Sequence, residues 1–361
     1  MSLPLPSVHD EAWRWTDFAA LEAAAASARA PAVDGTDWFL DLDGPKLLFV
    51  DGVLDAVRSD LGPLNLAEGN FDTEHALGAR TLGRPGWSAS LGAGAAGTVI
   101  QIVHVGSGGE SHVPASLTLA EDVPATLVET FVGGGWANRM ARIALGRSAR
   151  LMRAVRLLQG EGFVSLRDEA ELGEGASLAT TFLAAGGAST RIDGAAVLAA
   201  PGAFVEMGGA LLARGKQRHD SAMVVRHAAP EGTSRQLWRS VADDVAAASV
   251  AARVEVARDA QKTDGEQSLK GLLLSRTATI NAKPELEIFA DDVKCAHGAT
   301  VGELDRDALF YLASRGVPLD EAKALLTHAF VADAIERIGQ DEVREAFAAD
   351  AEAWLAGAGG R

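Results

Sequence analysis

The sequence predicts a mainly β protein with helical segments at both ends. Residues 98–227 contain many short stretches rich in Val, Ile, Leu, Thr and Phe, and glycine-containing corners separate them about every dozen residues. Between these stretches there is no helical period long enough to be convincing, which argues against alternating β-α-β units. Segments with helical spacing instead flank this region.

Two β architectures suit this pattern. Many short strands with frequent turns fit an antiparallel sandwich or barrel, and they also fit a β-helix in which each rung stacks on the last. Small residues near the glycine corners, such as Ala149, Ala176 and Ala203, favour stacked rungs because tight corners must superimpose. No strict repeat decides between the two architectures.

The N-terminal part, 1–95, is expected to be a helical and mixed segment. Apolar residues recur at helical spacing over 10–29, which predicts an amphipathic helix. An apolar run at 47–50 followed by Asp-Gly is typical of a strand and a turn. The stretch 82–97, with Pro85 and five glycines, is expected to be a linker and the early domain boundary.

The β core is expected over 96–302. Its alternation is imperfect, since Leu151 and Val155 share an apolar face that Arg153 interrupts. The strands expected in its first part are Val99–Val105, Ser116–Leu119, Leu127–Phe131, Met140–Leu145, Leu151–Leu158, Phe163–Arg167, Leu178–Leu183 and Val197–Ala200.

The C-terminal part, 303–361, is predicted to be a helical domain. Asp305 can cap a first helix that Gly316 ends. A second helix is expected over 319–338 because its apolar residues form a broad stripe, and a third, acidic and alanine-rich, over 341–355.

Composition and charge exclude several classes of function. The net charge of −16 would repel nucleic-acid phosphate and anionic lipid, so we expect neither nucleic acid nor a membrane as a partner. No apolar run is long enough for a membrane span, and residues 1–15 contain no secretory signal pattern. The single cysteine rules out an internal disulfide, which fits a cytoplasmic protein.

The segment Asp291–Gly302 holds the only cysteine, Cys295, and a histidine two residues later, His297. Thiolate and imidazole both bind borderline-soft metals, but a closed structural zinc site needs four such ligands. A metal or cluster bound here would therefore require a second chain. The alternative is a small buried thiol beside a hydrogen-bonded histidine.

Other sequence patterns of catalysis are weak or absent. The chain contains no phosphate-binding loop, no H-E-x-x-H and no G-x-S-x-G motif, so we expect no ATP hydrolysis and no enzyme activity. His219, Asp220 and His227 are capable of forming a metal site or an acid-base relay, and the alternative is that they are hydrogen-bonded residues on a sheet face.

The sequence resembles the SufB/SufD family of iron-sulfur cluster assembly scaffolds. The resemblance is strongest over Leu286–Gly302, and it continues through Leu309–Leu312 and Ser314–Gly316. Further matching positions are Glu11–Asp17, Asn138, Gln159, Arg191, His219, Asp220, His227, Ser234–Gln236 and Ala260–Asp264. The moderate length and short N-terminal part look more like SufD than the longer SufB. Residues 247–252 depart from the family pattern.

This resemblance implies a right-handed parallel β-helix core between the N-terminal and C-terminal helical segments. It also implies a complex with a SufB-like subunit and a SufC-like ATPase. A nascent iron-sulfur cluster would form only in that complex, with His297 and Cys295 as candidate ligands, and the isolated chain would hold no cofactor stably. The residues expected to contact partners are Asp291, Asp292, Lys294, Leu309, Phe310, Tyr311, Leu325 and Phe330.

Two further possibilities remain open from the sequence. Without a SufB-like partner, the chain is able to form a homodimer through the same β-helix edge, because an exposed edge invites pairing. The competing class of function is a β-helix enzyme, a lyase or hydrolase acting on a saccharide, although an acidic protein suits polyanionic sugars poorly.

Overall fold

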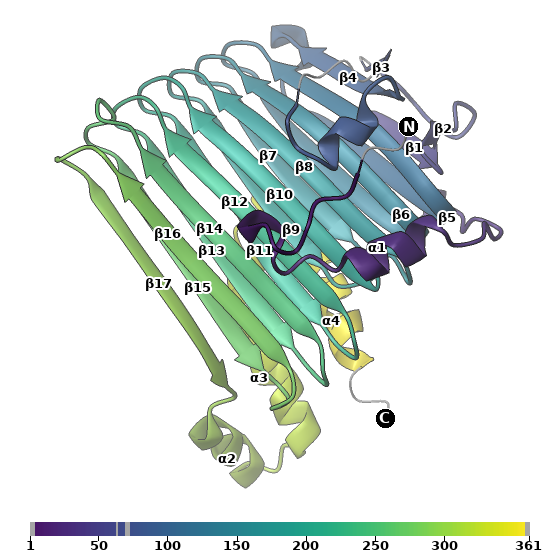
Figure 1. The fold of residues 1–361 in the computed structure, drawn as a ribbon, viewed down its shortest axis with the longest axis vertical. Helices are drawn as coiled ribbons and strands as arrows, with labels where there is room; N and C mark the ends of the chain where they lie inside the picture. The colour runs from purple at the N-terminus through teal and green to yellow at the C-terminus, as the bar shows by residue number, and fades with distance from the viewer. Residues whose placement is uncertain (1–3, 63, 69–72, 358–361) are drawn as a thin grey trace.

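A computed structural model describes residues 4–62, 64–68 and 73–357 and shows a parallel β-helix of about eight turns with helices at both ends (Figure 1). The predicted parallel β-helix is thereby confirmed. The helices are α1 (Phe18–Ala25), α2 (Arg306–Ser314), α3 (Leu319–Ile335) and α4 (Asp341–Ala356), with short 3-10 helices at Glu11–Trp13, Thr36–Trp38, Gly78–Thr81 and Ala93–Ala95. The strands are β1 (Lys46–Val50), β2 (Val53–Leu54), β3 (Asn65–Glu68), β4 (Pro85–Leu91), β5 (Thr98–Leu119), β6 (Pro124–Leu145), β7 (Arg150–Leu157), β8 (Phe163–Leu172), β9 (Ser177–Ala184), β10 (Ser189–Leu198), β11 (Phe204–Ala213), β12 (Arg218–His227), β13 (Thr233–Ala242), β14 (Ala247–Val256), β15 (Asp264–Leu273), β16 (Thr279–Ile288) and β17 (Lys294–Glu303).

Two parallel sheets face each other across the interior. After β6, each turn adds one strand to each sheet: β8, β10, β12, β14 and β16 form the even sheet, and β7, β9, β11, β13, β15 and β17 form the odd sheet. The long strand β6 passes through both sheets, since its first half pairs with β7 and its second half with β8. The facing sides of the sheets bury the main apolar core.

Residues on successive rungs are stacked in register. Ser189 on β10 pairs with Arg218 on β12, and their separation along the chain is 29 positions. Because side chains alternate between the two faces of a strand, register partners on neighbouring strands point to the same side. Inward-facing residues therefore form columns that run along the interior of the solenoid.

One corner of the solenoid repeats the same turn. Ser148, Glu231 and Lys262 occupy this corner with φ of 54°, 62° and 63°, a left-handed conformation that is costly for residues other than glycine. The amide N–H of each donates to a carbonyl of the next rung, for example from Glu231 to Gln261 at 2.9 Å. These bonds stack the corners on one another.

The stretch 82–97, expected to be a linker, contains the strand β4 instead. Trp87 and Leu91 are buried, and β4 pairs in parallel with β5. Gly86 does not mark a loop: a Cβ at this position would lie 1.9 Å from the carbonyl oxygen of Pro114 on the neighbouring strand, so only glycine allows this close approach. Similarly, the strands expected at 99–105 and 116–119 are both parts of the continuous β5.

The two ends of the solenoid differ. At the start of the solenoid, the short strands β2 and β3 pair antiparallel with β1 and β4 and cover their edges. At the other end, within the described residues, β16 pairs only with β14 and β17 only with β15. The last rung therefore leaves one hydrogen-bonding edge of each sheet without a strand partner.

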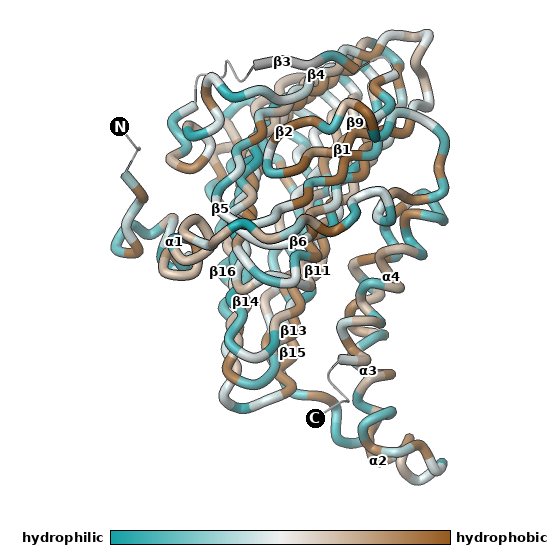
Figure 2. The backbone as a smooth tube through the Cα atoms, turned by 90° about the vertical axis from the view of Figure 1, so that its right-hand side faces the viewer, coloured by the Kyte–Doolittle hydropathy of each residue, from teal (hydrophilic) through white to brown (hydrophobic). Residues whose placement is uncertain are grey.

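Terminal segments cover the outer faces of the solenoid. Figure 2 shows α1 and the N-terminal segment on one side and the helices α3 and α4 on the opposite side. The N-terminal segment contacts the even sheet through Arg191 and Asp220, and α3 contacts β11 and β13 of the odd sheet. Two buried arginines fix the C-terminal helices: Arg156 pairs with Asp350 at 2.7 Å, and Arg239 pairs with Asp333.

The helical predictions are partly confirmed. The single helix expected over 10–29 is divided into a 3-10 turn and the shorter α1, because Asp17 caps a new helix by accepting from the amide of Ala20 at 3.0 Å. Asp305 does cap α2, and Gly316 follows α2 with φ of 84°. None of the helices in the described part of the chain has the length and apolarity that crossing a bilayer requires.

Candidate functional site

The last rung presents an exposed surface at the open end of the solenoid. This end-rung surface consists of β16, the turn 289–293 and β17. Whereas the inner strands are largely buried, β17 is exposed over nearly its whole length. The exposed apolar side chains of the end-rung surface include Ile288 (39%), Phe289 (60%) and Val301 (44%). Exposed apolar residues beside unpaired strand edges are typical of a protein interface.

Cys295 and His297 lie together on the inward face of β17. Cys295 is in register with Gly265 on β15, and His297 is in register with Gln267. The thiol lies next to Gly265, since a Cβ at this glycine would be in ordinary van der Waals contact with the Cys295 Sγ, at 3.5 Å. His297 is exposed at the open end, whereas Cys295 is half-buried. Burial raises the pKa of the Cys295 thiol, and the nearby Asp264 adds to this effect, although a hydrogen bond from the Gly265 backbone opposes it.

Three charged residues near Cys295 in the sequence are also exposed: Asp291, Asp292 and Lys294. Asp292 forms an ion pair with Lys262, and its carbonyl accepts from the amide of Lys262 at 2.7 Å, which extends the stacked corner to the last rung. Asp291 and Lys294 are exposed on the same turn and strand. These residues therefore form one border of the end-rung surface.

A second exposed surface lies on α2 and the first half of α3. This helical surface includes Phe310 (75% exposed), Tyr311 (56%) and Leu325 (56%). Leu309 lines a groove of about 490 Å³ between these helices and the turns of the odd sheet. Phe330 is different, because it packs against the core under α3 and is only partly exposed. Apart from Phe330, the residues predicted to contact partners divide between these two surfaces.

The polar residues His219, Asp220 and His227 do not form a metal site or a relay. His219 and Asp220 are adjacent in β12 and point to opposite faces: His219 faces the interior and contacts Thr190 Oγ1 at 3.1 Å, whereas Asp220 faces outward. His227 contacts Ser234 Oγ at 2.8 Å. The alternative of hydrogen-bonded sheet residues is correct. Across the described part of the chain, no three side chains among His, Cys, Asp and Glu are grouped to hold a metal ion.

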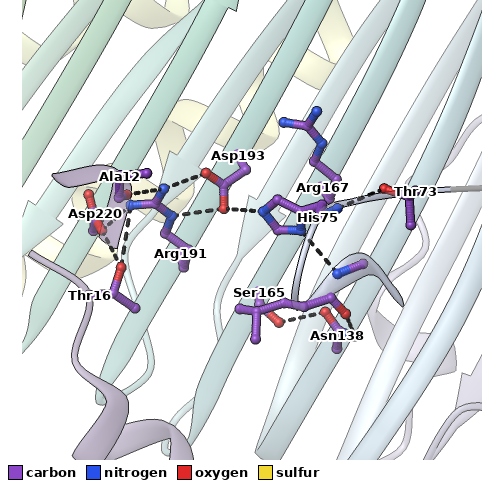
Figure 3. A network of polar contacts seen from close by, with 12 residues as sticks. Ala12, Thr16, Thr73, His75, Asn138, Ser165, Arg167, Arg191, Asp193 and Asp220 are labelled. Atoms are coloured by element: carbon purple, nitrogen blue, oxygen red, sulfur yellow. Dashed lines mark hydrogen bonds and ion pairs between the residues drawn. The ribbon is translucent and has the colours of Figure 1, made fainter. Parts of the chain in front are cut away.

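Asp220 belongs to a buried network that fixes the N-terminal segment (Figure 3). Arg191 pairs with both Asp193 and Asp220, and it also donates to the carbonyl of Ala12 at 2.8 Å. Thr16 donates to Asp220 at 2.8 Å. Burial alone would raise the pKa of Asp193, but Arg191 and a nearby histidine outweigh it and hold the pKa below its usual range.

A second buried network lies inside the solenoid. Glu129 and Asp168 pair with Arg139 and Arg153, and the side chains of all four are at most 1% exposed. Burial opposes ionisation of Glu129, yet the two arginines lower its pKa. The sequence signal for this network was the interruption of an apolar strand face by Arg153. Two balanced ion pairs explain why a charged residue occupies an inward position there.

Comparison with known proteins identifies the family. The family model described as "SUF system FeS cluster assembly, SufBD core domain" matches residues 104–330, which is more than half of the chain. The chain belongs to the SufB/SufD family. The match covers β6 to β17, α2 and most of α3, so it includes both exposed surfaces.

Curated relatives support the SufD-like character that the sequence predicted. The chain is 40% identical over 112 residues to the iron-sulfur cluster assembly protein SufD of Escherichia coli (strain K12), which is 31% of this chain and 26% of that protein. It is 32% identical over 234 residues to protein ABCI7, chloroplastic, of Arabidopsis thaliana, which is 61% of this chain and 48% of the relative. A SufBD family protein of Synechocystis is 40% identical over 124 residues, covering 34% and 27% of the two chains. The matched segments thus span about a quarter to a half of these relatives. Membership of this family does not favour the alternative of a saccharide-active enzyme.

Proposed function

We propose that this protein is a SufD-type scaffold subunit that works in the cytoplasm and is not itself an enzyme. It would pair with a SufB-like subunit through the end-rung surface and bind a SufC-like ATPase through the helical surface. The observation that carries this proposal is the open last rung, which places the family's most recognisable segment, 286–302, at two unpaired strand edges.

The geometry of the last rung supports pairing with another β-helix. A partner strand is able to add to the edge of β16 or β17 through main-chain hydrogen bonds, and the exposed Phe289 and Val301 would add apolar contact area. At the start of the solenoid a partner strand cannot add in this way, because β2 and β3 already cover the strand edges. The same edge would serve a homodimer when the SufB-like partner is absent.

The chemistry of Cys295 and His297 supports a role for His297 in holding the nascent cluster, which is the cargo of the complex. A thiol binds iron as its thiolate, and the raised pKa of Cys295 keeps the thiol protonated near neutral pH in the isolated chain. The imidazole of His297 is exposed, and a neutral imidazole is a good ligand for iron. Two ligands from this chain would need further ligands from the partner.

The exposed apolar side chains of α2 and α3 support the binding of the ATPase. The helix α2 has no buried residue, so its exposed Phe310 and Tyr311 are not needed for the packing of this chain. A subunit that binds there would reach the odd sheet through α3 and α4, which Arg239 and Arg156 fix to the solenoid.

Co-expression with the partner subunits tests the ligand role. His297→Ala should abolish the iron-dependent absorbance of the purified complex while leaving the complex intact. The matched control is His9→Ala, because His9 is also exposed and is distant from His297 in the sequence. An unchanged cluster yield in His297→Ala would contradict the role of this residue.

Size-exclusion chromatography of the isolated chain and of the complex would separate a homodimer from the heterodimer.

Copurification tests the two surfaces separately. Phe310→Asp with Leu325→Asp should remove the ATPase from the complex and leave the SufB-like subunit bound. Phe289→Asp with Val301→Asp should have the reverse effect. Loss of both partners in either double variant, without loss of folding by circular dichroism, would contradict the assignment of one partner to each surface.

A further inference from the structure

One inward column of side chains runs directly to His297. Gln236 on β13 is in register with Gln267 on β15, and Gln267 is in register with His297 on β17. Gln236 and Gln267 are each 1% exposed, so both amides lie inside the solenoid. Neighbouring strands are about 4.8 Å apart, and at this spacing stacked side-chain amides can hydrogen-bond to one another along a sheet.

The hydrogen bonds of the two glutamines are incomplete. Gln236 Nε2 donates to the carbonyl of Arg253 at 3.0 Å, but Gln236 Oε1 has no partner in the described chain. Neither Nε2 nor Oε1 of Gln267 has a partner among the described residues. A buried amide without partners is unfavourable, so Gln267 needs contacts on both the inner and the outer side of its rung.

The bond from Gln236 to Arg253 determines the direction of the column. Because Gln236 Nε2 is already a donor to Arg253, Gln236 Oε1 is free to accept from Gln267 Nε2. Gln267 Oε1 then points outward along the column and is able to accept an N–H from the imidazole of His297. In this arrangement the amide nitrogen and the amide oxygen of each glutamine have at least one partner, and the chain of bonds ends at the open rung.

Among the described residues, the facing sheet presents no polar side chain to Gln267. The inward positions of β16 opposite this column hold Ala282, Pro284 and Leu286, which are register partners of buried residues on β14 and have no polar side-chain atoms. On β15 itself, the inward neighbours of Gln267 are Gly265 and Leu269. His297 is therefore the polar side chain of the last rung that Gln267 is placed to meet.

We propose that Gln267 is the positioning residue of His297: its Oε1 accepts one ring N–H and leaves the other ring nitrogen unprotonated and available to iron. This inference rests on the proposed role of His297 as a ligand of the nascent cluster. Hydrogen bonds of this kind fix the tautomer and the ring orientation of metal-binding histidines. Gln267 itself would not touch the iron.

The tautomer of His297 tests the contact without any cluster. In the isolated full chain labelled with ¹⁵N-histidine, at a pH where imidazoles are neutral, the ratio of the two His297 tautomers should differ at least fivefold from that of the exposed His9. Gln267→Met should return the ratio to that of His9. Gln236→Met removes the acceptor that orients the Gln267 amide, so it should reduce the His297 bias, whereas Gln159→Met, at a buried glutamine outside this column, should keep it. A wild-type ratio equal to that of His9, or a bias that Gln267→Met does not change, would overturn the proposal, and the first of these needs no variant to fold.

Iron retention separates this inference from the proposed function. In the assembled complex, Gln267→Met should lower the iron affinity about tenfold, and Gln159→Met should leave it unchanged. If His297→Ala retains the full cluster yield, the ligand role fails while the tautomer result still decides the Gln267 contact. If His297→Ala loses the cluster but Gln267→Met shows neither the tautomer change nor the loss of iron, the positioning role alone is refuted.

Discussion

Two buried histidines should make the solenoid lose stability in mild acid. His219 and His227 are at most 1% exposed, and burial lowers the pKa of each to about 4. In the unfolded chain a histidine has a pKa of about 6.5. Between these values the unfolded chain binds a proton that the folded protein does not, so stability falls as the pH drops from about 6.5 towards 4.

The size of the effect follows from the two pKa values. At pH 5 an unfolded histidine carries nearly one proton and the buried one about 0.1, so each residue contributes about 0.9 protons to the uptake on unfolding. Each therefore costs about 2 kcal/mol of stability between pH 7 and pH 5. Together the two amount to about 4 kcal/mol, a large part of the stability of an ordinary domain.

Proton uptake on unfolding measures this directly. His227→Gln should take up about one proton fewer than the wild type when unfolded by urea at pH 5, and its unfolding free energy should fall about 2 kcal/mol less between pH 7 and pH 5. Equal uptake by His227→Gln and the wild type would refute the reasoning that burial keeps this imidazole neutral.

Three further predictions concern the packing of the solenoid. Arg191→Met should cost about 3–5 kcal/mol, because it leaves Asp193 and Asp220 buried without their cation, and limited proteolysis should then cut the N-terminal segment faster than in the wild type. Glu231→Gly should stabilise the protein by about 0.5–1 kcal/mol in urea unfolding because φ is 62° there, and an equal or lower stability would contradict the strain argument. Gly86→Ala should lower the unfolding free energy by about 3 kcal/mol, since the new Cβ has no space beside the neighbouring strand; a wild-type melting curve would show that this close approach is not rigid.

The sequence predicted the class of fold better than its details. Short apolar stretches and glycine corners indicate many strands, but antiparallel and stacked architectures share this pattern, and only the resemblance to a family separated them. The strands expected at 99–105 and 116–119 are one strand, β5, because glycines at 106, 108 and 109 let it bend between two sheets. Pairing between rungs 29 positions apart is not visible in any local window.

The residues of the candidate site, like the strands, were predicted only in part from the sequence. Cys295 and His297 were identifiable because their residue types are unusual together, and the acidic Asp291 and Asp292 precede them. Gln267 has no such signal, because a glutamine in a β-rich sequence is ordinarily a surface residue. Its significance depends on the register that places it under His297, and register requires the folded solenoid.

The difference between the two ends of the solenoid also orders events during synthesis. The covered end is made first, and each rung of about 29 residues can pair with the completed one before it as it leaves the ribosome. At about 5–20 residues per second, a new rung forms every few seconds, and its edge is exposed only until the next rung arrives. The edges of β16 and β17, which no later strand of the described chain covers, are the last strand edges to be made. The growing chain therefore presents a permanently unpaired edge only after the other rungs of the solenoid have been made.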